Sequence, residues 1–192
     1  MTVREIIDKK PESLIGRAFR LVKSSDHSLN RLPIAEILYK WQLDEATVVT
    51  SLIIELFRKG ALSSETIKNQ LGEDISFLAE GAIRLDKVQG LGSDTRAENL
   101  RKLILALSQD LRVVFLKLAE VLFKMRTIGA LPPIEQKKVA LEAQNIYAPL
   151  ALRLGMQNLS GELKDVAFPY IYPKEHEHLK EIVKDEYRAR EN

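Results

Sequence analysis

The amino-acid sequence predicts an all-α protein. Apolar residues recur at helical spacing through most of the 192 residues, and glycine, proline and capping residues stand at the ends of these segments. No stretch of convincing length alternates apolar and polar residues as a half-buried strand does. Since 45% of the residues are hydrophobic, the chain can bury a core of its own, and we expect roughly nine or ten helices in a single domain.

The first half of the chain carries signals for six helices. Thr2 can cap the first helix, Pro11 can start the second, and Pro33 opens the third. Asp44 can cap a long and largely apolar fourth helix, which Gly60 ends. The six helices are expected over residues 3–9, 11–23, 33–41, 45–59, 64–71 and 73–88, and the following QGLGSD predicts a loop.

The second half carries a stronger helical signal. Thr95 opens a segment in which apolar residues recur at i, i+3, i+4 and i+7. Asp110 starts the next segment, and the pair Pro132-Pro133 starts a long one that Gly155 closes. The expected helices cover residues 96–109, 111–128, 134–154, 158–168 and 174–190, of which the last is strongly charged.

The composition excludes several classes of function. Without cysteine, the chain has no thiol nucleophile, disulfide or cysteine-ligated metal site. A net charge of +2 gives no strong attraction to nucleic acid or to an anionic membrane. No apolar run approaches the ~18 residues that span a bilayer, and the N-terminus lacks the apolar core of a secretory signal. We therefore expect a cytoplasmic protein, or a part of one, with neither a membrane nor a direct nucleic-acid partner.

Residues for catalysis are scarce. The chain has three histidines, His27, His176 and His178, and neither a glycine-rich phosphate loop nor an arguable Ser-His-Asp set. His176 and His178 are two positions apart and would face different directions on a helix, which favours a solvated surface over a metal site. From the residues alone, the sequence predicts a helical domain without a visible catalytic set.

Longer sequence motifs indicate a family. The word RAENLRKLILALSQDLRVVFLKLAEVLFKMRTI, which ends at Ile128, resembles the N-terminal HD-type hydrolase domain of the RelA/SpoT family, the synthetases and hydrolases of guanosine tetra- and pentaphosphate. The resemblance continues through residues 145–155 and 161–168. It implies an all-α, HD-domain-like helix bundle over residues 1–173. The charged segment 174–192 would then be a connector helix toward a synthetase domain that this chain does not include.

The resemblance also identifies the positions of a metal site. Active members of the family hold one manganese ion through a histidine in an I-H-P word, a His-Asp doublet and an aspartate in a D-R-L-H-N word. Here the first histidine is replaced by Leu32, the doublet reads Ile54-Glu55, and the later aspartate is Glu120. Hydrocarbon side chains cannot coordinate a metal. The resemblance therefore implies that this chain binds no cofactor, although manganese is expected in active relatives.

Other positions that serve active members have changed as well. The Glu-Asp pair that follows the doublet, thought to position the attacking water, reads Arg58-Lys59. The His-Asn of the later word reads Phe123-Lys124. These losses together with those at the ligand positions predict that the hydrolase is inactive.

The resemblance leaves open a contact with a guanine nucleotide. Arg126 and Thr127 keep the family's Met-Arg-Thr word and are the weak candidates for it. The family's Lys-Ser-Gly-Glu-Pro-Tyr word, which contacts the nucleotide, is reduced to SSDHSL over residues 24–29. Arg126 would serve equally well as a cation that satisfies the carbonyls of a helix C-terminus.

The two retained carboxylates allow three interpretations. In the first, Glu55 pairs with Arg58 at i+3 and Glu120 pairs with Lys124 at i+4, as helix side chains commonly do. In the second, the Lys124 ammonium takes the place of the metal and holds both carboxylates, since a buried carboxylate pair without a cation would be unfavourable. In the third, the carboxylates alone form a weak cation site.

We interpret the chain as a catalytically inactive, regulatory hydrolase-like domain. The resemblance implies that its parent protein is a RelA-type GTP pyrophosphokinase of the stringent response, and that its partner is the synthetase domain of the same polypeptide. A guanine nucleotide is a weaker candidate partner. Two alternatives stay open: a weakened metal-dependent 3′-pyrophosphohydrolase, and an allosteric module that binds a nucleotide or a partner protein.

Overall fold

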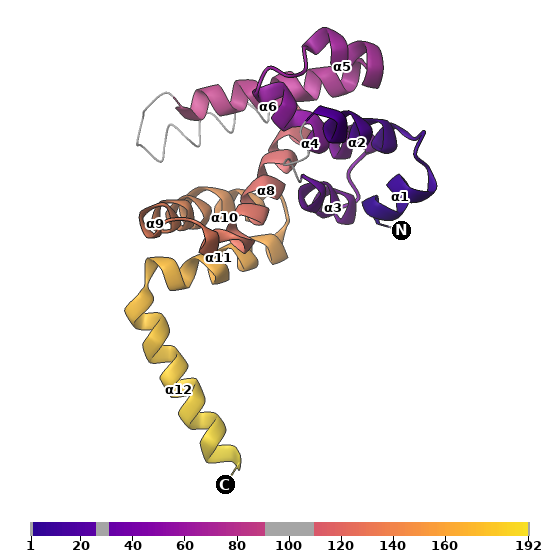
Figure 1. Ribbon diagram of the computed structural model, residues 1–192. Helices are drawn as coiled ribbons and strands as arrows, with labels where there is room; N and C mark the ends of the chain where they lie inside the picture. The colour runs from indigo at the N-terminus through magenta and orange to yellow at the C-terminus, as the bar shows by residue number, and fades with distance from the viewer. Residues whose placement is uncertain (1, 26–30, 91–109, 192) are drawn as a thin grey trace. The chain divides into compact units, whose positions relative to one another are not determined.

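The computed structural model describes residues 2–25, 31–90 and 110–191, with side chains for all of these except 25, 87–90 and 185–191. Every regular element in these ranges is helical, as predicted (Figure 1). The helix expected over residues 96–109 lies outside the described residues, as do residues 91–94 of the loop expected before it. The first two residues of that expected loop, Gln89 and Gly90, are instead the end of a helix, so the prediction was wrong there. The chain divides into two compact units, residues 1–120 and residues 121–192. The expected domain over residues 1–173, followed by a connector, stays a prediction.

The described residues of the first unit form six helices and the beginning of a further one. They are α1 (Val3–Lys9), α2 (Leu14–Ser25), α3 (Leu32–Lys40), α4 (Glu45–Arg58), α5 (Ser64–Leu71), α6 (Glu73–Gly90) and the first part of α8 (Leu111–Arg126). Helix α4 is central, because it packs against α2, α3 and α6 and is buried along most of its length. Figure 1 shows α5 and α6 side by side next to these helices.

The predicted caps are present in this unit. The Thr2 hydroxyl accepts the Glu5 amide and the Glu5 carboxylate accepts the Thr2 amide, which completes a capping box for α1. The Asp44 carboxylate accepts the Thr47 amide at 2.9 Å and starts α4. Gly72, with φ at 114°, ends α5. Local capping chemistry therefore sets these three helix ends as predicted, whereas α2 begins at Leu14 and not at Pro11, so the predicted start of the second helix was wrong.

The turn between α1 and α2 depends on a close backbone approach. A Cβ atom placed on Gly16 would lie 2.2 Å from the carbonyl oxygen of Pro11, so only glycine fits without a shift of the backbone. The same carbonyl accepts a hydrogen bond from the Arg20 guanidinium at 2.7 Å. Segment 10–13 is thus folded directly onto the first turn of α2.

One arginine joins the beginnings of three helices. The Arg112 guanidinium contacts Asp44 before α4 at 2.7 Å, Asp74 in the first turn of α6 at 2.8 Å and Asp110 before α8 at 2.7 Å. Hydrogen bonds from Arg112 lower the pKa of Asp110, although partial burial opposes the shift. Burial likewise opposes the lowered pKa of Asp44, which hydrogen bonds from Thr47 and Arg112 produce. The three helix ends are therefore tied electrostatically.

The second unit begins at Val121, within α8, and includes the last part of that helix. It contains a 3₁₀ turn (Ile128–Ala130), α9 (Pro133–Glu142), a π-helical segment (Ala143–Tyr147), α10 (Ala148–Arg153), α11 (Gln157–Ile171) and α12 (Pro173–Glu191). The prediction of one regular helix over residues 134–154 was wrong in the middle. Pro149 lacks an amide hydrogen and its ring would collide with the carbonyl of Asn145, four residues earlier, in α geometry. The wider π turn before Pro149 removes this conflict.

The last helix, α12, packs against α11 and presents apolar side chains to solvent. Its stripe of Leu179, Ile182 and Val183 has exposed fractions of 49%, 45% and 52%. The expected connector therefore begins as a helix close to residue 174, and its role stays a prediction. Among the helices of the described ranges, none is long and apolar enough to cross a membrane.

Candidate ionic site at the ligand positions

The structure brings together several of the residues singled out in the sequence. Ile54 is completely buried in α4, and Glu55 and Arg58 follow it on the same helix. Leu32 is the first residue of α3 and is half-buried. Glu120, on α8, lies against Arg58. The positions equivalent to the family's metal ligands therefore carry two hydrocarbon side chains and two carboxylates.

The carboxylates belong to a compact set of charges in the first unit, which we call the ionic cluster. It has three positive and three negative side chains, so its formal charge is zero. Its members come from the residue before α3 and from α4, α6 and α8: Arg31, Arg58, Lys117, Glu55, Asp86 and Glu120.

Arg58 is the centre of the ionic cluster. Its Nη1 and Nη2 donate to the two oxygens of Glu120 at 2.8 and 3.1 Å, a bidentate contact. Its Nε donates to Asp86 at 2.8 Å, and Nη1 lies 3.4 Å from Glu55. One guanidinium thus holds three carboxylates from three helices, including the Glu55 contact that i+3 spacing predicted.

Two further cations complete the ionic cluster. The Arg31 guanidinium binds Glu120, lies 3.7 Å from Glu55 and donates to the Ser51 carbonyl at 3.2 Å. Lys117 lies 3.1 Å from Asp86 and 4.0 Å from Glu120. Glu120 is consequently surrounded by three cationic groups.

The electrostatics of Glu120 follow from this arrangement. Its side chain is 13% exposed, and burial alone would raise its pKa. Hydrogen bonds from Arg58 and the charges of Arg31, Arg58 and Lys117 outweigh burial and lower the pKa of Glu120 to about 2. Burial lowers the pKa of Arg58, but its contacts with Glu120 and Asp86 raise that pKa further. Both groups are therefore charged throughout the physiological pH range.

The residues present do not fit the family's manganese ion. Leu32 and Ile54 offer no donor atom, and both oxygens of Glu120 accept from guanidinium groups. Within residues 2–25, 31–90 and 110–191, no group of three or more histidine, cysteine, aspartate or glutamate side chains could hold a metal ion. The positively charged guanidinium of Arg58 already occupies the carboxylates of Glu55 and Glu120, which a metal ion would need as ligands.

The hypothesis that Lys124 holds the two carboxylates was wrong about the residue. Lys124 is exposed, whereas Arg31, Arg58 and Lys117 hold Glu120. Sequence reasoning missed Arg31 because it is 89 positions from Glu120, a pairing that helical spacing does not reveal. Its one signal was a basic residue directly before Leu32. Of the other changed positions, Lys59 is exposed and Phe123 is half-buried.

The two candidate nucleotide residues are engaged within the second unit. Arg126 donates to Glu162 through Nε at 2.6 Å and Nη2 at 2.9 Å, and these hydrogen bonds raise the pKa of Arg126. The hydroxyl of Thr127, the residue after α8, donates to the Phe123 carbonyl in the last turn of that helix at 3.0 Å. Both side chains thus have intramolecular partners.

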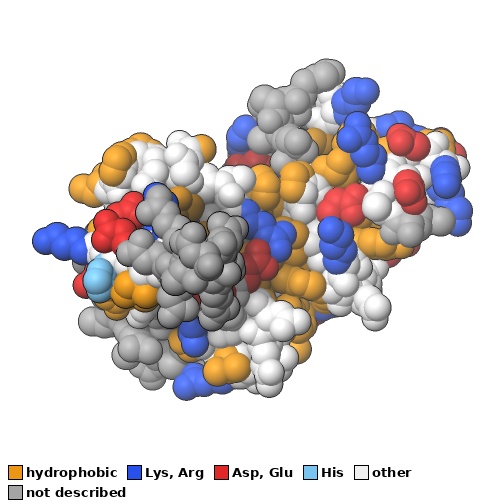
Figure 2. Space-filling model, turned by 90° about the horizontal axis from the view of Figure 1, so that it is seen from below, with side chains coloured by type: hydrophobic (Ala, Val, Ile, Leu, Met, Phe, Trp, Pro, Cys, Tyr) orange, Lys and Arg blue, Asp and Glu red, His pale blue; other side chains and the backbone are white. Residues whose placement is uncertain are grey.

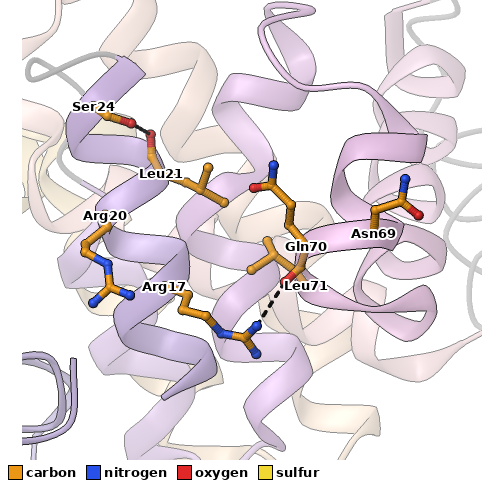
Figure 3. A pocket seen from close by; sticks show the side chains of 7 residues that line it. All are labelled: Arg17, Arg20, Leu21, Ser24, Asn69, Gln70 and Leu71. Atoms are coloured by element: carbon orange, nitrogen blue, oxygen red, sulfur yellow. Dashed lines mark hydrogen bonds between the residues drawn. The ribbon is translucent and has the colours of Figure 1, made fainter. Parts of the chain in front are cut away.

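A groove of about 480 Å³ lies between α2 and α5 (Figure 3). Two of its polar side chains are used by the fold: Arg17 donates to the Gln70 carbonyl, and Ser24 donates to the Leu21 carbonyl. On the face drawn in Figure 2, lysine and arginine side chains are interspersed with acidic ones. Neither feature indicates a specific anionic ligand.

Comparisons with known proteins show the family of the chain. A family described as "HD domain" matches residues 17–157. The "Guanosine-3′,5′-bis(diphosphate) 3′-pyrophosphohydrolase" of Vibrio cholerae is 36% identical over 157 residues, 81% of this chain and 22% of the relative. The "Bifunctional (p)ppGpp synthase/hydrolase SpoT" of Escherichia coli is 35% identical over 79% of this chain and 22% of its own length.

A relative with a different printed activity is equally similar. The "GTP pyrophosphokinase rsh" of Brucella melitensis is 36% identical over 173 residues, which are 84% of this chain and 23% of the relative. The chain therefore spans between a fifth and a quarter of the length of these relatives.

Proposed function

Because this chain belongs to the HD domain family, in the form found in RelA/SpoT proteins, we propose that it is a catalytically inactive, regulatory domain of a RelA-type GTP pyrophosphokinase. The observation that carries the proposal is the ionic cluster at the ligand positions. Glu120, the one carboxylate that replaces the family's later aspartate, is held by two guanidinium groups instead of facing an open coordination site.

The chemistry of the site supports inactivity. In active relatives, manganese would supply an activated water that attacks the 3′-pyrophosphate. Here an incoming divalent cation would meet Leu32, Ile54 and the positive charge of Arg58. Losing two of four ligands removes most of the affinity of such a site, and the arginines oppose a cation further.

We propose that the regulatory partner is a synthetase region of the same polypeptide. The E. coli and B. melitensis relatives, whose printed names include a (p)ppGpp synthase and a GTP pyrophosphokinase, are more than four times as long as the segment that this chain matches. The exposed stripe of Leu179, Ile182 and Val183 on α12 offers an apolar surface for that region. The domain would act in the cytoplasm, where the nucleotide substrates of a synthetase are found.

A hydrolysis assay tests the first part of the proposal. The purified chain is incubated with guanosine tetraphosphate and excess manganese, beside the N-terminal domain of the E. coli relative as a positive control. We expect release of pyrophosphate from the control alone. Manganese-dependent turnover by this chain that Glu120→Gln abolishes would contradict the proposal and favour the weakened hydrolase.

The gene sequence beyond the codon for Asn192 tests the second part. We expect a synthetase region to follow in frame. In that longer protein, the double variant Ile182→Glu/Val183→Glu is expected to change the rate of synthesis of guanosine tetraphosphate, whereas Lys180→Glu, on the same helix, should leave it unchanged. Equal rates of synthesis for the unaltered longer protein, the double variant and Lys180→Glu would contradict a regulatory role of the apolar stripe on α12.

A further inference from the structure

We infer that Arg58 performs the structural work of a bound cation in the first unit, so that its helices are held together without any metal ion. This inference goes beyond the proposed regulatory role, because it concerns what stabilises the fold. It rests on the contacts of one side chain with Glu55 of its own helix, Asp86 of α6 and Glu120 of α8.

A guanidinium is suited to this task. Its five N–H donors lie in one plane, so it can bind two carboxylates through separate edges at once. The Arg58 contacts use both edges: Nη1 and Nη2 serve Glu120 at 2.8 and 3.1 Å, while Nε and Nη2 serve Asp86 at 2.8 and 2.7 Å. An ammonium group at the same place has three donors around a single atom and could not reproduce both contacts.

Burial makes the charge of Arg58 necessary. Its side chain is 21% exposed, and none of the described buried side-chain nitrogen or oxygen atoms lacks a hydrogen-bond partner. Without the guanidinium, Arg31 and Lys117 would be left among the described cations that pair with Glu55, Asp86 and Glu120. Leaving a largely buried carboxylate without its partner is strongly destabilising, more so than removing both charges together.

The covalent attachment of this cation has two consequences that can be measured. A chelator cannot remove it, so EDTA should leave the stability of the domain unchanged. Its positive charge also opposes a second cation at the same carboxylates, so manganese should not stabilise the fold by binding.

Thermal unfolding of the purified chain, followed by circular dichroism, tests the inference. The melting temperature of the unaltered protein should be the same in buffer, in excess EDTA and in millimolar manganese chloride. Arg58→Met, which keeps the volume and removes the charge, should lower it by about 6 °C or more. Arg58→Lys keeps the charge and loses the planar set of guanidinium donors. Its melting temperature should lie between those of the unaltered protein and Arg58→Met, so a folded variant is available if Arg58→Met does not fold.

Matched variants separate a cation role from general damage. Arg126→Met breaks a bidentate pair with Glu162, whose partners are 48% and 36% exposed, and should lower the melting temperature by about 2 °C or less. The double variant Arg58→Met/Glu120→Gln should be more stable than the sum of the two single losses predicts, because the orphaned carboxylate is gone.

Three outcomes would overturn the inference: equal shifts for Arg58→Met and Arg126→Met, a loss of stability in EDTA, or a gain in manganese that Glu120→Gln removes. The first of these leaves the proposed inactivity intact, since it concerns stability alone. Manganese-dependent hydrolysis without a stability effect would instead contradict the proposed function and leave the role of Arg58 standing.

Discussion

Acidification should destabilise this protein through one carboxylate. The pKa of Glu120 falls from an ordinary value of 4.5 to about 2 in the folded protein, where burial is outweighed by Arg58, Arg31 and Lys117. In the unfolded chain the carboxylate binds a proton at higher pH than in the folded chain. The contribution of Glu120 to stability is therefore complete above about pH 5 and is lost as the pH falls from 4.5 toward 2.

The magnitude follows from the size of the pKa difference. A lowering of about 2.5 pH units corresponds to about 3 kcal/mol of stability, of which about 2 kcal/mol is lost by pH 3. Glu120 is 13% exposed, so solvent screening takes little from this figure.

Chemical denaturation of the unaltered chain and of Glu120→Gln near pH 6 and near pH 3 measures this contribution. The glutamine variant cannot take up the proton, so its free energy of unfolding should fall by about 2 kcal/mol less between the two pH values. Glu162→Gln removes a half-buried carboxylate outside the ionic cluster and serves as the control, with a pH dependence like that of the unaltered chain. If Glu120→Gln and Glu162→Gln show the same pH dependence, Glu120 does not have the lowered pKa.

Three substitutions test the backbone and packing. Gln42 has a left-handed φ of 59° after α3, so Gln42→Gly should raise the free energy of unfolding by about 0.5–1 kcal/mol, measured by urea denaturation. Gly81→Ala would place a Cβ 2.9 Å from Val113 Cγ2, so it should lower the free energy of unfolding by about 1–2 kcal/mol. Gly161→Ala meets open space in α11 and should raise it by up to about 1 kcal/mol; a loss there, or a gain at Gly81, would contradict the packing described.

Local features of the fold could be predicted from the sequence, because their causes are local. Helix starts at Thr2 and Asp44 follow from side chains that reach an amide three residues away. The π-helical segment could not be foreseen as readily. Pro149 signals a disturbance in its helix, but a kink, a break and a widened turn are all possible responses to it.

The candidate site divides in the same way. The replacement of the family's histidine ligands by Leu32 and Ile54 is visible in the sequence once the family's motifs are recognised. The cations that hold Glu120 are not, because Arg31 reaches it across 89 positions. Helical spacing offered Lys124 instead, but an exposed lysine keeps its ammonium hydrated, while Glu120 accepts from groups that are already buried beside it.

The tight turn at Gly16 has a consequence for the N-terminal helix. A helix of seven residues such as α1 is too short to persist in water by itself, so its existence relies on anchoring, which the fully buried Val3 provides. Segment 10–13, which joins α1 to α2, passes so close to Gly16 that there is no room for a methyl group. Gly16→Ala would displace segment 10–13 from α2. The N-terminal residues would then be expected to fray and become accessible to proteases before any other described part of the first unit unfolds.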